Sequence, residues 1–260
     1  MLYKKKNRNR EIIYGINAVT SALENEPDKI TAAWLVKGRE DDRRIMKIEQ
    51  MLNQYGIKVQ SAMRHFMDEK SEGGVHQGVI IEMVATPPKD EHFLEDMVEA
   101  AENEDSSDLY LVLDGVTDPH NLGAAMRSAW AAGAKAVIVP KDKSAPFSPV
   151  ARKTASGAAA VVPLIAVTNL ARALNFLKEH GVEVVGMAGE SAGSIFEHEF
   201  SRKTAIVMGS EESGMRRLTR ENCDAIVKIP MADGVESLNV SVAAGIALFE
   251  VVRRNSLKQD

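Results

Sequence analysis

The 260-residue chain contains a single cysteine, Cys223. One cysteine excludes an intrachain disulfide framework, and it also excludes the usual cysteine-based zinc sites. Such a composition fits the reducing cytoplasm. The basic start of the sequence, MLYKKKNRNR, is not followed by a long apolar run, so the sequence predicts neither a signal peptide nor a membrane span. We therefore expect a cytoplasmic protein without a membrane partner.

The sequence also lacks a G-x-G-x-x-G motif after any strand-like run. This motif would bring glycine backbone against the pyrophosphate of a dinucleotide. Its absence argues against a nicotinamide-dependent dehydrogenase, although the segment GAKAVIVP at 133–140 resembles part of such a fold.

The net charge of −5 argues at first against a nucleic-acid partner. The acidity is concentrated, however, in residues 86–107, which carry one Lys against eight Asp and Glu. Residues 108–260 are balanced, with 17 basic and 17 acidic residues. Five of the first ten residues are Lys or Arg, which predicts either a phosphate-binding arm or a solubilising tail.

The length of the chain and a shift in composition indicate two domains. Residues 11–84 alternate helix-like segments with strand-like ones such as ITAAWLV, as in a small α/β domain at 1–85. Apolar residues recur at helical spacing at Ile45, Ile48, Met51 and Leu52. For His76, a structural or RNA-contacting role is favoured over catalysis. Paired prolines and an acidic run predict a linker over 86–107.

The stretch from Leu109 to Pro140 has the pattern of strand, loop, helix and strand. Asn121 stands where a helix N-cap belongs, and Arg127 follows about two turns later. A loop at the carboxyl end of a parallel strand is a usual place for chemistry. On this stretch by itself, an ordinary βαβ unit is an equal alternative.

Two further loops, at 209–215 and 230–241, also follow strand-like runs. In a parallel sheet all three loops open at one edge, so one site draws on all of them. A helix from about Asn239 is apolar on nearly every face. The sequence therefore predicts that the sheet and a partner subunit bury it on all sides.

The segments DGVTDPHNLGAAMRSA, IVMGSEESGM and IPMADGVESLNVSVAAG resemble the three motifs of the SPOUT class of RNA 2′-O-ribose methyltransferases, in the TrmH-like branch. With YGINAV and VHQG, the resemblance to the branch's 23S ribosomal RNA guanosine-2′-O-methyltransferases covers essentially the whole chain. It implies a homodimeric α/β enzyme without a DNA partner. The enzyme has a ribosomal-protein-like RNA-binding domain at 1–85. Its second domain, at 108–260, has a parallel sheet and contains a deep trefoil knot.

The resemblance also implies S-adenosylmethionine as cosubstrate, bound at Gly209, Ile229 and Leu238. A glycine allows close backbone approach, and backbone groups beside apolar residues read adenine without charged side chains. Core packing is the alternative for Ile229 and Leu238. The family's acid falls on Glu211, which would hold Arg127 or balance the sulfonium charge, with helix capping as the alternative.

Arg127 matches the arginine that acts on the ribose hydroxyl in the family. Methyl transfer is an in-line displacement that requires no metal, and the 2′-hydroxyl is barely acidic. Because a guanidinium stays protonated, we expect Arg127 to bind the phosphate or the developing alkoxide rather than act as a free base. Asn121, Asn239 and Ser241 match the remaining polar positions of the family and would orient the ribose, Arg127 or the cofactor carboxylate, with N-capping as the alternative for both asparagines. The proton acceptor stays open.

The family usually has a glycine where Glu212 stands and a small residue where Glu236 stands, and many relatives have an acid where Ala160 stands. These three differences bear on the fit of the substrate. Two other functions are compatible with the resemblance. A transfer-RNA ribose methyltransferase of the same branch would share the motifs, and a non-catalytic RNA-binding or ribosome-assembly protein would share the fold. The joint presence of Arg127, Glu211, Asn239 and Ser241 favours an enzyme.

Overall fold

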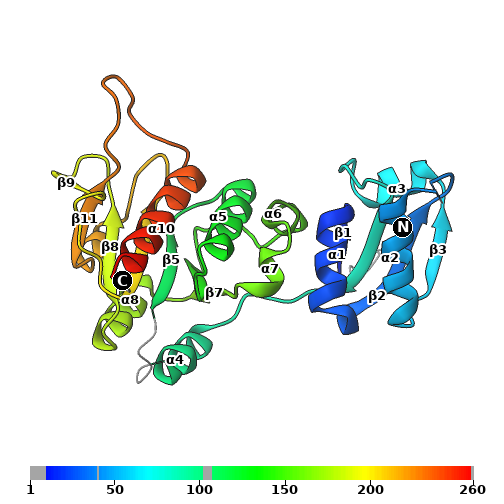
Figure 1. Ribbon diagram of the computed structural model, residues 1–260, viewed down its shortest axis with the longest axis horizontal. Helices are drawn as coiled ribbons and strands as arrows, with labels where there is room; N and C mark the ends of the chain where they lie inside the picture. The colour runs from blue at the N-terminus through cyan, green and yellow to red at the C-terminus, as the bar shows by residue number, and fades with distance from the viewer. Residues whose placement is uncertain (1–9, 40, 102–106, 259–260) are drawn as a thin grey trace, which may run out of the picture.

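The computed structural model of the chain describes residues 10–39, 41–101 and 107–258. Two lobes, each built on its own β-sheet, lie side by side along the long axis of the molecule (Figure 1). Nine of the ten residues of the predicted basic arm lie outside the described residues. Within the described ranges, no helix is long and apolar enough to cross a membrane.

The smaller lobe contains a four-stranded sheet in the order β1-β4-β2-β3. β4 pairs antiparallel with β1 and with β2, while β2 and β3 are parallel. The predicted strand ITAAWLV corresponds to β2. The strands are β1 Arg10–Tyr14, β2 Ile30–Val36, β3 Val59–Ala62 and β4 Val79–Val84.

Helices cover both faces of the smaller sheet. α1 (Ile16–Asn25) and α2 (Arg43–Gln54) pack on one face, and α3 (Arg64–Lys70) packs on the other. The 3-10 turn η1 (Pro27–Lys29) contacts α1. The stripe predicted on α2 faces the core: Ile45, Ile48 and Leu52 are buried, and Met51 is partly buried at its edge. The apolar spacing of that segment determines which side of α2 faces the sheet.

His76 has a structural role in the smaller lobe. Its ring is buried, its Nδ1 accepts a hydrogen bond from Gly78 N at 3.0 Å, and its Nε2 lies 3.1 Å from Asp68 Oδ1. Because Nδ1 is an acceptor, the proton resides on Nε2 and is donated to Asp68. The motif VHQG also supplies Gln77, whose Oε1 accepts from Ile16 N at the start of α1.

The larger lobe contains seven parallel strands in the order β7-β6-β5-β10-β8-β11-β9. The expected parallel-sheet domain is therefore present, while the trefoil knot stays a prediction. Each central strand is an apolar run, as expected of strands buried on both faces. The strands are β5 Asp108–Asp114, β6 Ala136–Pro140, β7 Leu164–Val167, β8 Glu183–Met187, β9 Gly193–Ser194, β10 Lys203–Gly209 and β11 Ala225–Lys228.

Helices form a layer on each face of this sheet, and alternate residues of β5 show the division. Leu111 and Leu113 face one hydrophobic core, and Tyr110 and Val112 face the other. Four helices cover the first core: α5 (Pro119–Ala131), α6 (Pro149–Ala155), α7 (Ala158–Val161) and α10 (Val240–Ser256). Two helices cover the second core: α4 (Glu91–Ala100) and α8 (Leu170–Glu179). The short helix α9 (Arg217–Glu221) lies beside α8.

Much of the segment predicted as a linker packs against the larger sheet. Leu94 and Val98 of α4 are buried, and the backbone of Lys89 forms a parallel bridge to Ile165 of β7. Residues 102–106 lie outside the described residues. The functional division of the chain at 85 and 107 stays a prediction.

One face of α10 is buried and the opposite face is exposed in the single chain. Ala244, Leu248 and Val251 contact the sheet side, but Val242 is 52% exposed and Phe249 is 48% exposed. These two residues are seven positions apart and so lie on one helical face. The prediction of burial on all sides therefore requires a partner.

The two lobes contact each other through a buried ion pair. Arg152 Nε of α6 lies 2.8 Å from Glu11 Oε2 of β1, and their side chains are only 7% and 9% exposed. Burial raises the pKa of Glu11, and the guanidinium of Arg152 opposes this shift. Arg152 Nη2 also donates to the carbonyl of Thr86 at 2.6 Å. Nearby, a Cβ on Gly157 would lie 2.6 Å from Ser21 Oγ, so this contact needs glycine.

We predict that Arg152→Ala separates the lobes. The substitution leaves the Glu11 carboxylate buried without a counter-charge, which costs about 3–5 kcal/mol unless the carboxylate reaches water. Small-angle X-ray scattering should show a larger radius of gyration with unchanged circular dichroism. The double variant Glu11→Gln, Arg152→Met removes both charges and should restore the compact form. A wild-type scattering curve for Arg152→Ala would contradict the prediction.

Candidate active site

Three loops meet at the carboxyl edge of the larger sheet. β5 and β10 are neighbours in register, with Asp114 beside Gly209, so the loops that follow them begin side by side. The third loop runs from β11 to the start of α10, and the amino end of α10 lies against the first two loops. The topology therefore brings together segments that are about one hundred residues apart in sequence.

The N-cap of α5 is Asp118, three residues before the predicted position. Its carboxylate accepts a hydrogen bond from His120 N at 2.9 Å, and Pro119 occupies the first helical position. Proline is favoured there because its missing N–H would be unpaired anyway. The capping interpretation of Asn121 is therefore wrong. Asn121 lies inside the first turn, and its side chain points toward the second loop.

Glu211 joins the three loops through one carboxylate oxygen. Its Oε1 accepts hydrogen bonds from Asn121 Nδ2, Asn239 Nδ2 and Val240 N, each at 3.1 Å. Hydrogen bonds to a charged acceptor are stronger than neutral ones, and a carboxylate is favoured at a helix amino terminus. Glu211 thus has the capping role considered from the sequence, and it also fixes both asparagine side chains.

Asn239 has the N-capping role that is the alternative given for it from the sequence, while its role toward the substrate stays a prediction. It is the N-cap of α10, since its Oδ1 accepts from Ser241 N at 3.0 Å and from Ser241 Oγ at 2.6 Å. Its Nδ2 donates to Asn121 Oδ1 at 2.9 Å. The structure therefore gathers Asn121, Glu211, Asn239 and Ser241 into one cluster, which we call the asparagine cluster.

Arg127 lies outside the asparagine cluster of its own chain. It is exposed on α5, and none of the described residues forms a hydrogen bond or ion pair with it. It is six residues after Asn121, which corresponds to about 9 Å along the helix and about 120° around it. Within one chain, therefore, Asn121 and Arg127 do not face the same point.

A cavity of about 350 Å³ adjoins the asparagine cluster and contains two of the three predicted cofactor residues. Gly209 and Leu238 line it, together with Met187, Met208 and Glu190. Ile229 instead packs against the main core, which is the alternative considered for it. A Cβ on Gly209 would lie 2.2 Å from the backbone of Gly214 and Met215, so glycine is needed where the loop folds back on itself.

Sequence reasoning missed Arg216 as a site residue. Its backbone N–H and Nε donate to the two oxygens of buried Asp114, at 2.8 and 2.6 Å. Asp114 and Arg216 line a second cavity of about 370 Å³ with Asn121, Glu211 and Lys143. The signal in the sequence was an aspartate at the end of an apolar strand, but its partner lies 102 residues away.

The three departures from the family pattern lie in different places. Glu212 is exposed and lines the second cavity, Glu236 is exposed on the third loop, and Ala160 lies in α7. Burial raises the pKa of the Cys223 thiol to about 12, so it is not a nucleophile at neutral pH. Among the residues that the structure describes, no three His, Cys, Asp or Glu side chains converge as metal ligands would.

The chain belongs to the SpoU rRNA methylase family, whose model matches residues 108–249. A second family model, described as RNA 2′-O ribose methyltransferase substrate binding, matches residues 12–88. A relative from Yersinia pestis, the 23S rRNA (guanosine-2′-O-)-methyltransferase RlmB, is 51% identical, and the match covers 95% of this chain and 99% of the relative.

Two solved structures are also similar. The SpoU methyltransferase AviRb from Streptomyces viridochromogenes, in complex with AdoMet, has a TM-score of 0.78 and 20% identity, over 98% of this chain and 96% of that chain. At that identity the likeness shows the fold. The A. aeolicus TrmH/SpoU tRNA modifying enzyme has a TM-score of 0.53 and 26% identity, over 64% of this chain and 86% of that chain.

We predict that Glu211→Ala loosens the start of α10. The Val240 N–H loses its acceptor, which is worth about 1 kcal/mol for one partly buried hydrogen bond. Hydrogen exchange at Val240, followed by NMR, should accelerate about fivefold. Glu212→Ala removes the same charge from the neighbouring position and should leave this exchange unchanged. Equal rates in the two variants would contradict the structural role of Glu211.

Proposed function

We propose that this protein transfers a methyl group from S-adenosylmethionine to the ribose 2′-hydroxyl of a guanosine in 23S ribosomal RNA. The observation that carries the proposal is the asparagine cluster, in which residues of all three family motifs are fixed beside two cavities at one sheet edge. The extensive identity to the 23S relative supports the substrate. A ribosomal RNA substrate also places the enzyme in the cytoplasm.

The residues around the 350 Å³ cavity suit a nucleoside cosubstrate. Met208, Leu238 and Ala243 supply its apolar lining, while the 209–214 loop, Ser237 and the ion pair of Glu190 with Arg220 supply polar groups. Apolar walls with a few placed polar groups are typical of ligand sites. In this proposal Gly209 and Leu238 border the adenosine, and Ile229 supports the loop from the core side.

When bound, S-adenosylmethionine supplies an electrophilic methyl group on sulfur and leaves as a neutral thioether. The chain must therefore align the 2′-hydroxyl and stabilise the charge that develops on its oxygen. Asn121 and Asn239 are held by Glu211, so their orientation does not change with the substrate. Preorganised side chains of this kind orient a ribose without further loss of entropy.

Two arginines are assigned here to the nucleotide that is methylated. Arg216 is fixed by Asp114 through Nε, and it borders the 370 Å³ cavity beside Asn121. We assign Arg216 to the phosphate next to the target ribose, since a guanidinium suits phosphate geometry. We keep Arg127 as the group that stabilises the alkoxide, provided that it is supplied by a second copy of the chain.

We predict that the purified protein and S-adenosylmethionine produce 2′-O-methylguanosine in 23S ribosomal RNA from cells that lack the gene. Nucleoside mass spectrometry measures the product, and 23S RNA from cells with the gene is the control, because its site is already methylated. Incorporation into transfer RNA instead would support the tRNA alternative. An absence of product with either RNA, under conditions that allow RNA binding, would support a non-catalytic binding protein.

We also propose that the protein is a homodimer formed through the exposed face of α10. Val242, Phe249 and Val252 form an apolar stripe on this face, beside α5 and next to Asn239. A closed two-fold dimer covers the same stripe on both copies. Because Arg127 is exposed on the neighbouring helix, such a dimer places the arginine of one copy toward the cluster of the other.

Mixed dimers test this arrangement. Arg127→Ala lacks the arginine, while Leu238→Arg fills the cosubstrate cavity, and each is expected to be inactive by itself. If Arg127 acts across the dimer, an equal mixture refolded together regains about a quarter of the wild-type activity, because each heterodimer has one complete site. If Arg127 acts within its own chain, the mixture stays inactive, and the proposed arrangement is wrong.

A further inference from the structure

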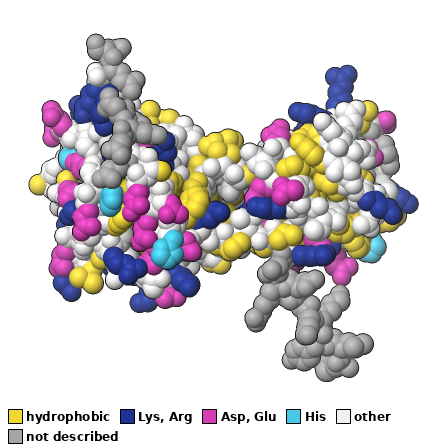
Figure 2. Space-filling model, turned by 90° about the horizontal axis from the view of Figure 1, so that it is seen from below, with side chains coloured by type: hydrophobic (Ala, Val, Ile, Leu, Met, Phe, Trp, Pro, Cys, Tyr) yellow, Lys and Arg dark blue, Asp and Glu magenta, His cyan; other side chains and the backbone are white. Residues whose placement is uncertain are grey.

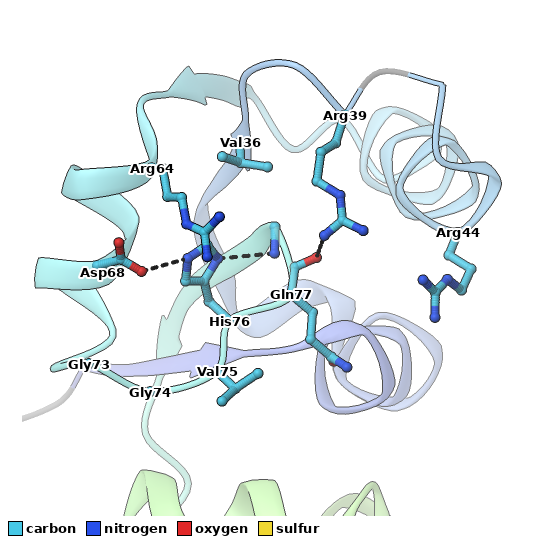
Figure 3. A pocket seen from close by; sticks show the side chains of 11 residues that line it. Val36, Arg39, Arg44, Arg64, Asp68, Gly73, Gly74, Val75, His76 and Gln77 are labelled. Carbon is cyan, nitrogen blue, oxygen red and sulfur yellow. Dashed lines mark hydrogen bonds and ion pairs between the residues drawn. The ribbon is translucent and has the colours of Figure 1, made fainter.

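A cavity of about 470 Å³ in the smaller lobe takes no part in the proposed chemistry. Three arginines line it: Arg39 in the segment before α2, Arg44 in the first turn of α2, and Arg64 at the start of α3. The turn at 73–78 forms its base. Figure 3 shows Arg39 and Arg64 extending toward the same turn from opposite sides.

Counting the described residues alone, the three guanidinium groups in this cavity outnumber the two carboxylates beside them. Asp42 is shared by Arg39 at 3.0 Å and by Arg44 at 3.4 Å, and Asp68 is bound to His76. None of the described residues forms a hydrogen bond or ion pair with Arg64. Elsewhere, on the face displayed in Figure 2, acidic and basic side chains are interspersed over the larger lobe.

The base of the cavity is held in one conformation. His76 is buried between Asp68 and Gly78, and Gln77 caps α1 while adopting a φ of 54°. A positive φ at glutamine costs about 1 kcal/mol or more, and it persists only where the surroundings fix it. Arg39 Nη1 donates to the carbonyl of Gln77 at 3.1 Å, which directs this guanidinium across the turn.

The same turn contacts the larger lobe. Lys153 Nζ of α6 donates to the carbonyl of Val75 at 3.3 Å and lies 4.6 Å from the centre of the Tyr14 ring. In Figure 3 the helices of the larger lobe lie directly beyond Val75. The Val75 side chain is 70% exposed, beside the arginines. A ligand in the cavity therefore lies at the boundary between the lobes.

We propose that this arginine-lined cavity binds a phosphodiester of an unpaired segment of the RNA substrate, away from the nucleotide that is methylated. The inference rests on the proposed function. Guanidinium groups bind phosphate through two parallel hydrogen bonds and stack on unpaired bases, whereas a regular RNA helix has no protruding phosphate that enters a cavity. The position at the lobe boundary lets one RNA strand contact this cavity and the larger lobe together.

The test compares two triple variants with the same change of charge. Arg39, Arg44 and Arg64 are replaced by Gln in the first, and Arg43, Lys47 and Lys58 in the second. The control residues are exposed in the same lobe and do not line the cavity. Filter binding of a 23S RNA fragment should weaken about 10- to 100-fold in the first variant, and its log–log salt slope should fall by about 1–2.

The methylation readout separates this proposal from the proposed function. The cavity variant should show a raised KM for RNA, with kcat at saturating RNA and S-adenosylmethionine affinity unchanged. Equal RNA affinity in both triple variants would overturn the cavity assignment, even if the wild type methylates 23S RNA. If no RNA is methylated but the affinity difference persists, only the proposed function fails.

Two further measurements secure the interpretation. Arg64→Gln by itself removes a side chain without a partner among the described residues, so it should fold normally and still weaken RNA binding several-fold. Guanosine monophosphate and inorganic phosphate, added separately, distinguish a polymer from a free phosphate ligand. The proposal would be overturned if the wild type binds either small molecule tightly, the cavity variant does not, and both proteins bind RNA with equal affinity.

Discussion

The candidate site depends on one oxygen atom that accepts three hydrogen bonds. Glu211 Oε1, on the second loop, accepts hydrogen bonds from the Asn121 side chain after the first loop and from the Asn239 side chain and the Val240 N–H at the end of the third loop. Without this acceptor, the first turn of α10 has an unpaired N–H, and the two asparagine side chains keep only their hydrogen bond to each other. The same contact therefore completes a helix and places the polar groups of the site.

The smaller lobe is attached to this arrangement by a different kind of contact. Arg152 and Glu11 are buried charges, so the lobes adopt a defined relative position only while each charge has its partner. Such a pair favours one arrangement more than it adds stability. This matters for an RNA that contacts both lobes, because the distance between its two binding regions is fixed before the RNA arrives.

Local patterns in the sequence predict the elements well but not their long-range partners. The strand β2, the stripe on α2 and the start of α10 at Asn239 follow from periodicity and capping chemistry. The local pattern suggests Asn121 as the N-cap of α5, because Asp118 and Pro119 suit a turn as well as a helix start. In the structure Asp118 is the N-cap. The Asp114–Arg216 pair and the packing of α4 depend on topology, which no local pattern contains. The three family motifs predict that the loops meet at one site. They do not predict which way the Arg127 side chain faces, because that depends on its position around the helix.

The hydrogen bond between Asn121 and Asn239 can form only late in the synthesis of the chain. The two residues are 118 positions apart, and Asn239 is the cap from which α10 begins. At ordinary rates of translation, roughly 6–24 s separate the synthesis of the first asparagine from that of the second. During this interval the chain lacks Asn239, so neither the cap of α10 nor the contact between the first and third loops can form.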